Sequence, residues 1–207
     1  MRYSEHGEEE IILNFFKDHE NRIVLEAGAR NGVQDSNSRS LIAHYGWKGI
    51  LCEPDPRQFT DLEALYGEDE NIILLDDVLF NINKETILYL SQKSGSDAKA
   101  GHNTTSEVFK ARAEKLSGVI YPKKIVKNTK TLSQVFEKFG LKKIDYISID
   151  CEGVDYEVIS GINFDVVDIS MISFEPSIQE KQIRDFLESK EYVFYDSTWG
   201  NVFYVKR

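Results

Sequence analysis

The chain of 207 residues is poor in cysteine, with Cys52 and Cys151 alone, and it contains no long hydrophobic run. Two cysteines are too few for a disulfide framework or a four-cysteine zinc site, and no histidine pair has the spacing of metal ligands. No segment approaches the ~18 apolar residues of a membrane-spanning helix, and residues 1–20 lack the apolar core of a secretory signal. We therefore expect a cytoplasmic protein with reduced cysteines and no membrane span.

Positive charge is also scarce, since the chain has 25 lysines and arginines but 35 acidic residues, which gives a net charge of −10. This balance argues against nucleic acid as a partner. The basic stretch at residues 123–130 is the local exception, and we interpret it as a solvated edge strand. The length and the 41% hydrophobic content predict one globular domain over residues 1–207.

Two nucleotide-binding motifs are absent after the first apolar run. Residues 28–32 read Gly-Ala-Arg-Asn-Gly, which lacks the G-x-G-x-x-G spacing, and no Gly-Lys-Ser/Thr follows. The first absence argues against a nicotinamide-dependent oxidoreductase, and the second against a P-loop nucleotidase.

Hydrophobic periodicity predicts alternating strands and helices along the chain. The expected strands cover residues 23–29, 49–53, 72–79, 86–90, 123–130, 144–150, 169–175, 192–196 and 201–206. A helix is expected within residues 1–20, and residues 91–107 are expected to form a long loop able to cover a substrate. The alternation indicates an α/β fold with a mostly parallel sheet, helices on both faces and a C-terminal antiparallel hairpin.

Acidic residues end several of the buried strands, namely Glu26, Glu53 and Asp150, with Glu152 two positions further on. In an open α/β sheet, ligands bind beyond the carboxyl ends of the strands, so these acids should share one rim. Any one of them could simply cap the following helix. The combination of four, with glycines beside two of them, favours a cationic ligand rich in hydroxyl groups.

The residues around this rim match the parts of an aminoacyl nucleoside. Glu26 would attract an ammonium group, and the helix start near Ser36 would favour a carboxylate. Glu53 is placed to accept hydrogen bonds from a ribose diol. S-adenosylmethionine is a molecule with all three features.

The sequence resembles the FkbM-type S-adenosylmethionine-dependent methyltransferases over nearly its whole length. The most specific matching segments are Gly-Trp-Lys-Gly-Ile-Leu-Cys-Glu-Pro at residues 46–54 and Ile-Asp-Tyr-Ile-Ser-Ile-Asp-Cys-Glu-Gly at residues 144–153. The resemblance implies a Rossmann-like fold with a seven-stranded sheet and O-methylation of a hydroxyl group, on a sugar, a glycan or another small molecule. One departure is Arg30, which stands where the family usually has a small amide.

The resemblance also implies roles for single residues. The methionine part of the cofactor would be lined by Glu26, Gly28, Ala29, Asn31 and Gly32. Its carboxylate would face Ser36 and Asn37, and its ribose would bind Glu53. Either Asp76 or Asp77 would approach the adenine amino group.

The reaction requires an aligned acceptor oxygen and a base that removes its proton. Asp150, Glu152 and His102 are the candidates for this base, and His102 lies in the long loop. Alternatively, Asp150 and Glu152 could hold Mg²⁺ together with Glu175, and the ion would orient two sugar hydroxyls.

A non-catalytic glycan- or nucleoside-binding domain on the same fold is the competing hypothesis, and Arg30 is the feature that permits it. Trp199 near the end of the chain is expected to pack in the core or to stack on a sugar ring.

Overall fold

The computed structural model describes residues 3–17, 21–95 and 101–207. Parts of the predicted N-terminal helix and of the predicted 91–107 loop therefore lie outside the described residues. The helices are α1 (Glu8–Phe15), α2 (Arg39–Tyr45), α3 (Pro56–Tyr66), α4 (Glu107–Leu116), α5 (Leu132–Lys138), α6 (Asp155–Ser160) and α7 (Glu180–Ser189). The strands are β1 (Ile23–Ala27), β2 (Lys48–Cys52), β3 (Ile72–Leu75), β4 (Val78–Leu79), β5 (Glu85–Lys93), β6 (Val119–Lys130), β7 (Lys143–Ile149), β8 (Asp168–Phe174), β9 (Tyr192–Ser197) and β10 (Val202–Lys206).

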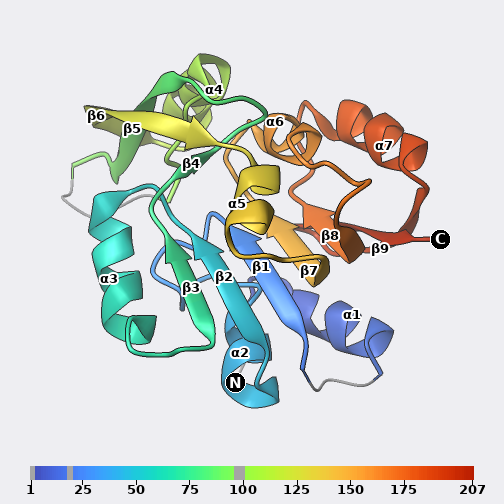
Figure 1. Ribbon diagram of the computed structural model, residues 1–207. Helices are drawn as coiled ribbons and strands as arrows, with labels where there is room; N and C mark the ends of the chain where they lie inside the picture. Colours follow the sequence, from blue (N-terminus) through green and yellow to red (C-terminus); the bar gives the residue numbers. More distant parts are fainter. Residues whose placement is uncertain (1–2, 18–20, 96–100) are drawn as a thin grey trace.

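Seven strands form one sheet in the order β3-β2-β1-β7-β8-β10-β9 (Figure 1). The first five are parallel, and β10 runs antiparallel to both β8 and β9. Parallel neighbours need crossover connections, which the helices between them supply. The predicted α/β fold with a mostly parallel sheet and a C-terminal antiparallel hairpin is confirmed.

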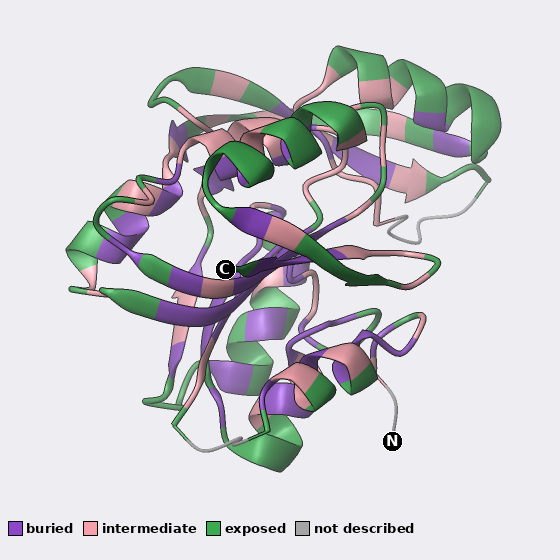
Figure 2. Ribbon diagram, turned by 90° about the vertical axis from the view of Figure 1, so that its right-hand side faces the viewer, coloured by how far each residue is buried: buried purple, intermediate pink, exposed green. Residues whose placement is uncertain are grey.

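Helices cover both faces of this sheet. On one face, α5, α6 and α7 bury apolar side chains such as Phe136, Ile159 and Leu187 against the strands. On the other face, α1 and α2 pack around Trp47 and Tyr146, and α3 contributes Leu62 and Tyr66 to an adjoining cluster. The central strands are accordingly buried while the outer sides of the helices are exposed (Figure 2). Strands buried on both sides have no alternating pattern, which is why they read as continuous apolar runs.

A second, three-stranded sheet in the order β4-β6-β5 lies beside the main one, with α4 against β6 (Figure 1). The sequence predicted a single strand over 72–79, which is wrong, because the chain leaves the main sheet after Leu75 and Val78–Leu79 pair with β6 instead. Lys127 and Lys130 of β6 form ion pairs with Asp76 and Asp77 at this break. Two adjacent aspartates fit poorly in a buried strand, and here they meet cations instead.

The predicted long loop is shorter than expected. β5 extends to Lys93, and its pairing with β6 reaches Lys93↔Val119. The polar residues Ser91 and Gln92 therefore lie in a strand rather than in a loop. Partner strands stabilised this segment despite its composition, since strand propensity depends strongly on neighbours.

Candidate functional site

One row of residues lies just beyond the carboxyl ends of the parallel strands. The register aligns Ala27 with Cys52 and Ile149, Cys52 with Leu75, and Ile149 with Phe174. The residues that follow these strand ends are Gly28, Glu53, Asp76, Asp150 and Glu175. The structure thus brings Glu53 and Asp150 to one edge as predicted, where ligands of open α/β sheets bind, whereas Glu26 lies within β1.

Gly28 lets β1 and β7 approach each other closely at this edge. Its φ is +90°, and a Cβ there would lie 2.0 Å from the main-chain oxygen of Asp150. The amides of Gly28 and Ala29 both donate to the carbonyl oxygen of Cys52. Only glycine satisfies both the left-handed backbone and the close approach. Gly32 (φ +72°) ends the same turn.

Asn31, predicted to line the cofactor, turns its side-chain oxygen toward its own loop. This oxygen accepts from the main-chain N–H groups of Val33 and Gln34 at 3.1 and 3.0 Å. Asn31 thereby stabilises the turn through side-chain to main-chain hydrogen bonds.

Glu26 is buried, and the segment after the glycine turn surrounds its carboxylate. Ser36 and Ser38 donate to one carboxylate oxygen at 2.8 and 2.6 Å, and the main-chain N–H of Asn37 donates to the other at 2.7 Å. The side-chain amide of Asn37 donates to Ser148 at 2.9 Å. Burial raises the pKa of Glu26, and these donors oppose that rise. Glu26 and the Ser36–Asn37 segment therefore bind each other.

Glu53 is also buried, at 3% exposure. Its two carboxylate oxygens accept from the main-chain N–H groups of Arg30 and Asp55, each at 2.8 Å. Burial raises the pKa of Glu53 to about 7, against the effect of these two donors. Each oxygen keeps a second acceptor site, because a carboxylate offers about four in all. A vicinal diol could use the two that remain.

Asp150, Glu152 and Glu175 form a compact group of carboxylates. One oxygen from each lies within 4.8 Å of the others. Asp150 reaches solvent, but the protein atoms packed around it limit its hydration, which raises its pKa. Burial and the Asp150 carboxylate raise the pKa of Glu175 to about 7, and burial with both neighbours raises that of Glu152 well above its ordinary value. Such crowding of like charges is typical of catalytic and metal-binding sites.

Glu152 has a φ of +54°, a left-handed conformation that is uncommon outside glycine, asparagine and aspartate. Arg30 (φ +51°) and Asp35 (φ +57°) border the same edge in the same conformation. Local strain of this kind concentrates at functional sites.

His102 lies against the carboxylate group. Its Nδ1 is 3.2 Å from Oε1 of Glu152. The hydroxyl of Thr104 donates to the main-chain oxygen of Glu152 at 2.7 Å, and the Tyr121 hydroxyl donates to the main-chain oxygen of His102 at 2.8 Å. The segment carrying His102 is therefore fixed to the sheet edge from two sides.

Asn103 anchors this segment further, and sequence reasoning missed its role. Its side-chain oxygen accepts from the Ser91 N–H at 2.8 Å, and its amide donates to the buried Asp55 at 2.9 Å. Asp55 also caps α3 and pairs with Arg57 at 2.6 Å. The Asp-Pro sequence after the second strand signalled the cap, but nothing local signalled the contact with Asn103.

Arg30 turns toward the acidic edge. Its Nη1 is 2.5 Å from the carboxylate of Asp35, and its guanidinium lies against Gly101. Its charge opposes the rise in the pKa values of Asp150 and Glu152. The residue that departs from the family pattern is therefore part of the site.

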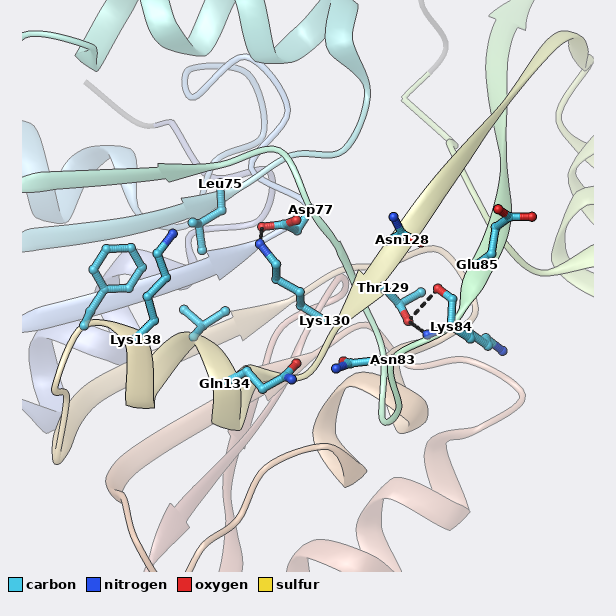
Figure 3. A pocket seen from close by; sticks show the side chains of 12 residues that line it. Leu75, Asp77, Asn83, Lys84, Glu85, Asn128, Thr129, Lys130, Gln134 and Lys138 are labelled. Carbon is cyan, nitrogen blue, oxygen red and sulfur yellow. Dashed lines mark hydrogen bonds and ion pairs between the residues drawn. The ribbon is translucent and has the colours of Figure 1, made fainter.

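The side chains of Asp76 and Asp77 have different surroundings: Asp76 is largely exposed to solvent, and Asp77 lines a cavity. Asp76 is paired with Lys127 at 3.0 Å and its side chain is 62% exposed, whereas Asp77 pairs with Lys130 at 2.8 Å. Asp77 lines a cavity of about 460 Å³ between the end of β3, the second sheet and α5 (Figure 3). Burial and the negative charges of Asp77 and Glu53 contribute to raising the pKa of the Cys52 thiol at the end of β2. Asp77 therefore lies near the acidic edge.

The turn between β9 and β10 lies at the same edge. Phe174 pairs with Val202, which in turn pairs with Ser197, so residues 198–201 follow the carboxyl end of β8. Trp199 in this turn is 90% exposed, which contradicts the expectation that it packs in the core. The alternative expectation, that its ring stacks on a sugar, stays a prediction. Its ring lies 6.0 Å from that of His6.

A family model described as Methyltransferase FkbM domain matches residues 26–194. A search of curated protein sequences gave no match. In the part of the chain that the structure describes, no helix is long and apolar enough to cross a membrane.

Several solved structures have a similar chain path at low sequence identity. A putative caffeoyl-CoA O-methyltransferase from Staphylococcus aureus is 11% identical, with a TM-score of 0.47 over 96% of this chain and 82% of that chain. A precorrin-6y C5,15-methyltransferase from Geobacter metallireducens is 11% identical, with a TM-score of 0.45 over 95% of this chain and 87% of that chain. At these values the likeness concerns the general fold alone.

Proposed function

Because this chain belongs to the FkbM methyltransferase domain family, we propose that it transfers the methyl group of S-adenosylmethionine to a hydroxyl oxygen of a sugar or glycan. The observation that carries the choice of a hydroxyl acceptor is the group formed by Asp150, Glu152, Glu175 and His102. These side chains accept hydrogen bonds and take up protons, as a hydroxyl-rich acceptor requires. The free cysteines fit a reducing, cytoplasmic setting.

The residues at the carboxyl edge fit the cofactor. Glu53 has acceptor sites left for the ribose hydroxyls, and the turn from Gly28 to Gly32 would line the methionine part. We assign the adenine amino group to Asp77 rather than Asp76, because Asp77 lines the cavity at the end of β3 and lies near Cys52 at the end of β2. When bound, the cofactor supplies an electrophilic methyl group on a sulfonium sulfur.

The His102–Glu152 pair is the best-placed base. The contact between Nδ1 and the Glu152 carboxylate orients the imidazole, so that Nε2 is left to take the proton of the acceptor hydroxyl. The carboxylate then stabilises the imidazolium that forms. Asp150 would accept a hydrogen bond from a neighbouring hydroxyl of the acceptor and so help to hold the attacking oxygen in line.

A divalent cation is the second candidate for organising the acceptor. The three clustered carboxylate oxygens of Asp150, Glu152 and Glu175 are the kind of ligand that Mg²⁺ prefers. An ion there would bind two neighbouring hydroxyls and lower the pKa of one of them. This arrangement would draw Glu152 away from His102, so the two proposals predict different responses to chelation.

The Asp150→Ala variant tests the proposal. We expect it to lose methyl transfer to a panel of glycans and sugars by at least about a hundredfold, because the acceptor oxygen is no longer held in line. Calorimetric titration should show that its affinity for S-adenosylhomocysteine stays close to that of the wild type. Asp168→Ala is the matched control, since Asp168 lies at the opposite end of β8 and pairs with Lys206 on the surface.

Three outcomes are informative. Equal turnover by Asp150→Ala and the wild type would contradict the assigned role. Loss of wild-type turnover with a chelator, and its return with Mg²⁺, would favour the cation over the His102–Glu152 base. Cofactor binding by the wild type without transfer to any hydroxyl acceptor would favour a non-catalytic glycan- or nucleoside-binding domain.

A further inference from the structure

We infer that Arg30 binds the carboxylate of the methionine part of the cofactor, an inference that rests on the proposed function. The groups that the sequence assigned to this carboxylate are engaged elsewhere. The Ser36 hydroxyl and the Asn37 main-chain N–H donate to Glu26, and the Asn37 side chain donates to Ser148. With these bonds made, Arg30 is a further donor that an anion at this edge could use.

One edge of the Arg30 guanidinium is available to bind an anion. Nη1 is held by Asp35 at 2.5 Å. Nε is buried and has no hydrogen-bond acceptor among the described residues. A buried donor without an acceptor is costly, so a partner for it is expected. The edge formed by Nε and Nη2 has the fork geometry that binds a carboxylate through two parallel hydrogen bonds.

Gly101 keeps the space beside this edge open. A Cβ at position 101 would lie 2.9 Å from Nη2, 3.0 Å from Cζ and 3.3 Å from Nε of Arg30. Any side chain there would crowd the part of the guanidinium that lacks an acceptor. The backbone of Gly101, at φ +83°, also favours glycine.

The backbone of Arg30 places this residue between two parts of the ligand. Its main-chain N–H donates to Glu53, the residue assigned to the ribose, while its side chain extends toward Asp35 and Gly101. Its left-handed conformation costs roughly 1 kcal/mol or more.

Charge supports the same assignment. The edge holds the acids Glu53, Asp150, Glu152 and Glu175, which would repel an incoming carboxylate. The charge of Arg30 opposes the raised pKa values of the first three. The carboxylate of a zwitterionic amino acid binds beside these acids more favourably when it meets a positive charge.

The experiment compares two ligands that differ by the carboxylate alone. S-adenosylhomocysteine and its decarboxylated form, which keeps adenosine, sulfur and ammonium, are titrated calorimetrically into the wild type and Arg30→Gln. We expect the substitution to weaken S-adenosylhomocysteine binding by about ten- to a hundredfold and to leave the decarboxylated ligand within about twofold. Arg30→Lys, which keeps the charge and loses the fork, should fall between. Arg184→Gln, at an exposed arginine of α7 paired with Glu180, is the control.

Comparing two ligands in two forms of the protein isolates the contribution of the contact between Arg30 and the ligand carboxylate. Equal weakening of both ligands by Arg30→Gln would overturn the inference, because Arg30 would then shape the site as a whole. Unchanged binding of both ligands would overturn it as well. Failure of the wild type to bind either ligand would instead reject the proposed function. Binding of the decarboxylated ligand also shows that the variant is folded.

Discussion

At the scale of the residue, the buried carboxylate of Glu53, which we propose binds the ribose, lowers the stability of the fold. Its carboxylate is buried and its pKa is raised from 4.5 to about 7. Above pH 4.5 the unfolded chain releases this proton, whereas the folded chain retains it until about pH 7. The folded state therefore binds more protons in this window, and its stability falls as pH rises through it.

Glu53→Gln should remove this pH dependence. Relative to the wild type, we expect the variant to gain on the order of 3 kcal/mol of unfolding free energy between about pH 4.5 and about pH 8. Urea denaturation at both pH values measures the difference, and hydrogen bonds lost in the variant cancel in the comparison. The same variant should bind S-adenosylhomocysteine more weakly, because Gln offers the ribose diol fewer acceptor sites. A stability difference that does not change with pH would show that folding does not raise the pKa of Glu53.

Sequence reasoning at this scale placed two of the acids correctly and was incomplete for their partners. The strand-end positions of Glu53 and Asp150 placed both on one edge, as the register confirms, whereas Glu26 lies within β1. The engagement of Ser36 and Asn37 by Glu26 could not be predicted, because it depends on a side-chain orientation across the turn.

At the scale of the element, the β9–β10 hairpin adds a surface to the site. Its turn lies beside the carboxyl end of β8, and Trp199 projects from it into solvent. Glu8 fixes the turn by accepting hydrogen bonds from Thr198 and Asn201. An exposed indole in a fixed turn next to a group of carboxylates suits the apolar face of a sugar ring.

Trp199→Ala should raise the KM for a glycan acceptor by about five- to thirtyfold, with kcat nearly unchanged, because the indole contributes contact area rather than chemistry. Affinity for S-adenosylhomocysteine should stay the same. Phe194→Ala removes another exposed aromatic from β9 and serves as the control.

Fluorescence provides a direct reading of this contact. Trp47 is buried and Trp199 is the other tryptophan, so Trp47→Phe leaves Trp199 as the single reporter. Acceptor binding should protect Trp199 from quenching by acrylamide. An unchanged KM for Trp199→Ala, with no protection, would remove the hairpin from the acceptor site.

Element boundaries were predictable where side chains act locally. Thr131 and Gln134 form the capping box that starts α5, and Gly46 ends α2 in a left-handed conformation. Boundaries set by strand pairing were not predictable, as the division of residues 72–79 between two sheets shows. Pairing partners lie far away in the sequence, so no local pattern contains them.

At the scale of the whole molecule, negative charge dominates. The net charge is −10, and several carboxylates are concentrated at one edge of the sheet. Mutual repulsion among them destabilises the compact state, and salt screens it over about 10 Å at 0.1 M.

We therefore expect the melting temperature at about pH 8 to rise by roughly 2–4 °C when the sodium chloride concentration rises from about 20 to about 300 mM, which corresponds to about 1 kcal/mol. At about pH 5 the rise should be small, because carboxylates with raised pKa values are then protonated. Thermal unfolding followed by circular dichroism measures both. A lower melting temperature in salt at about pH 8 would show that ion pairs outweigh the repulsion.

The sequence by itself determined the class of fold, the succession of the main strands along the chain and the place of Glu53 and Asp150 at the ligand edge. These properties follow from local patterns, namely apolar runs, capping residues and the residue that ends each strand. Only the tertiary structure decided that His102 meets Glu152, that Glu26 holds Ser36 and Asn37, and that Arg30 turns toward the carboxylates. These contacts join segments that lie apart in the chain and depend on the path of the loops, which no local pattern specifies.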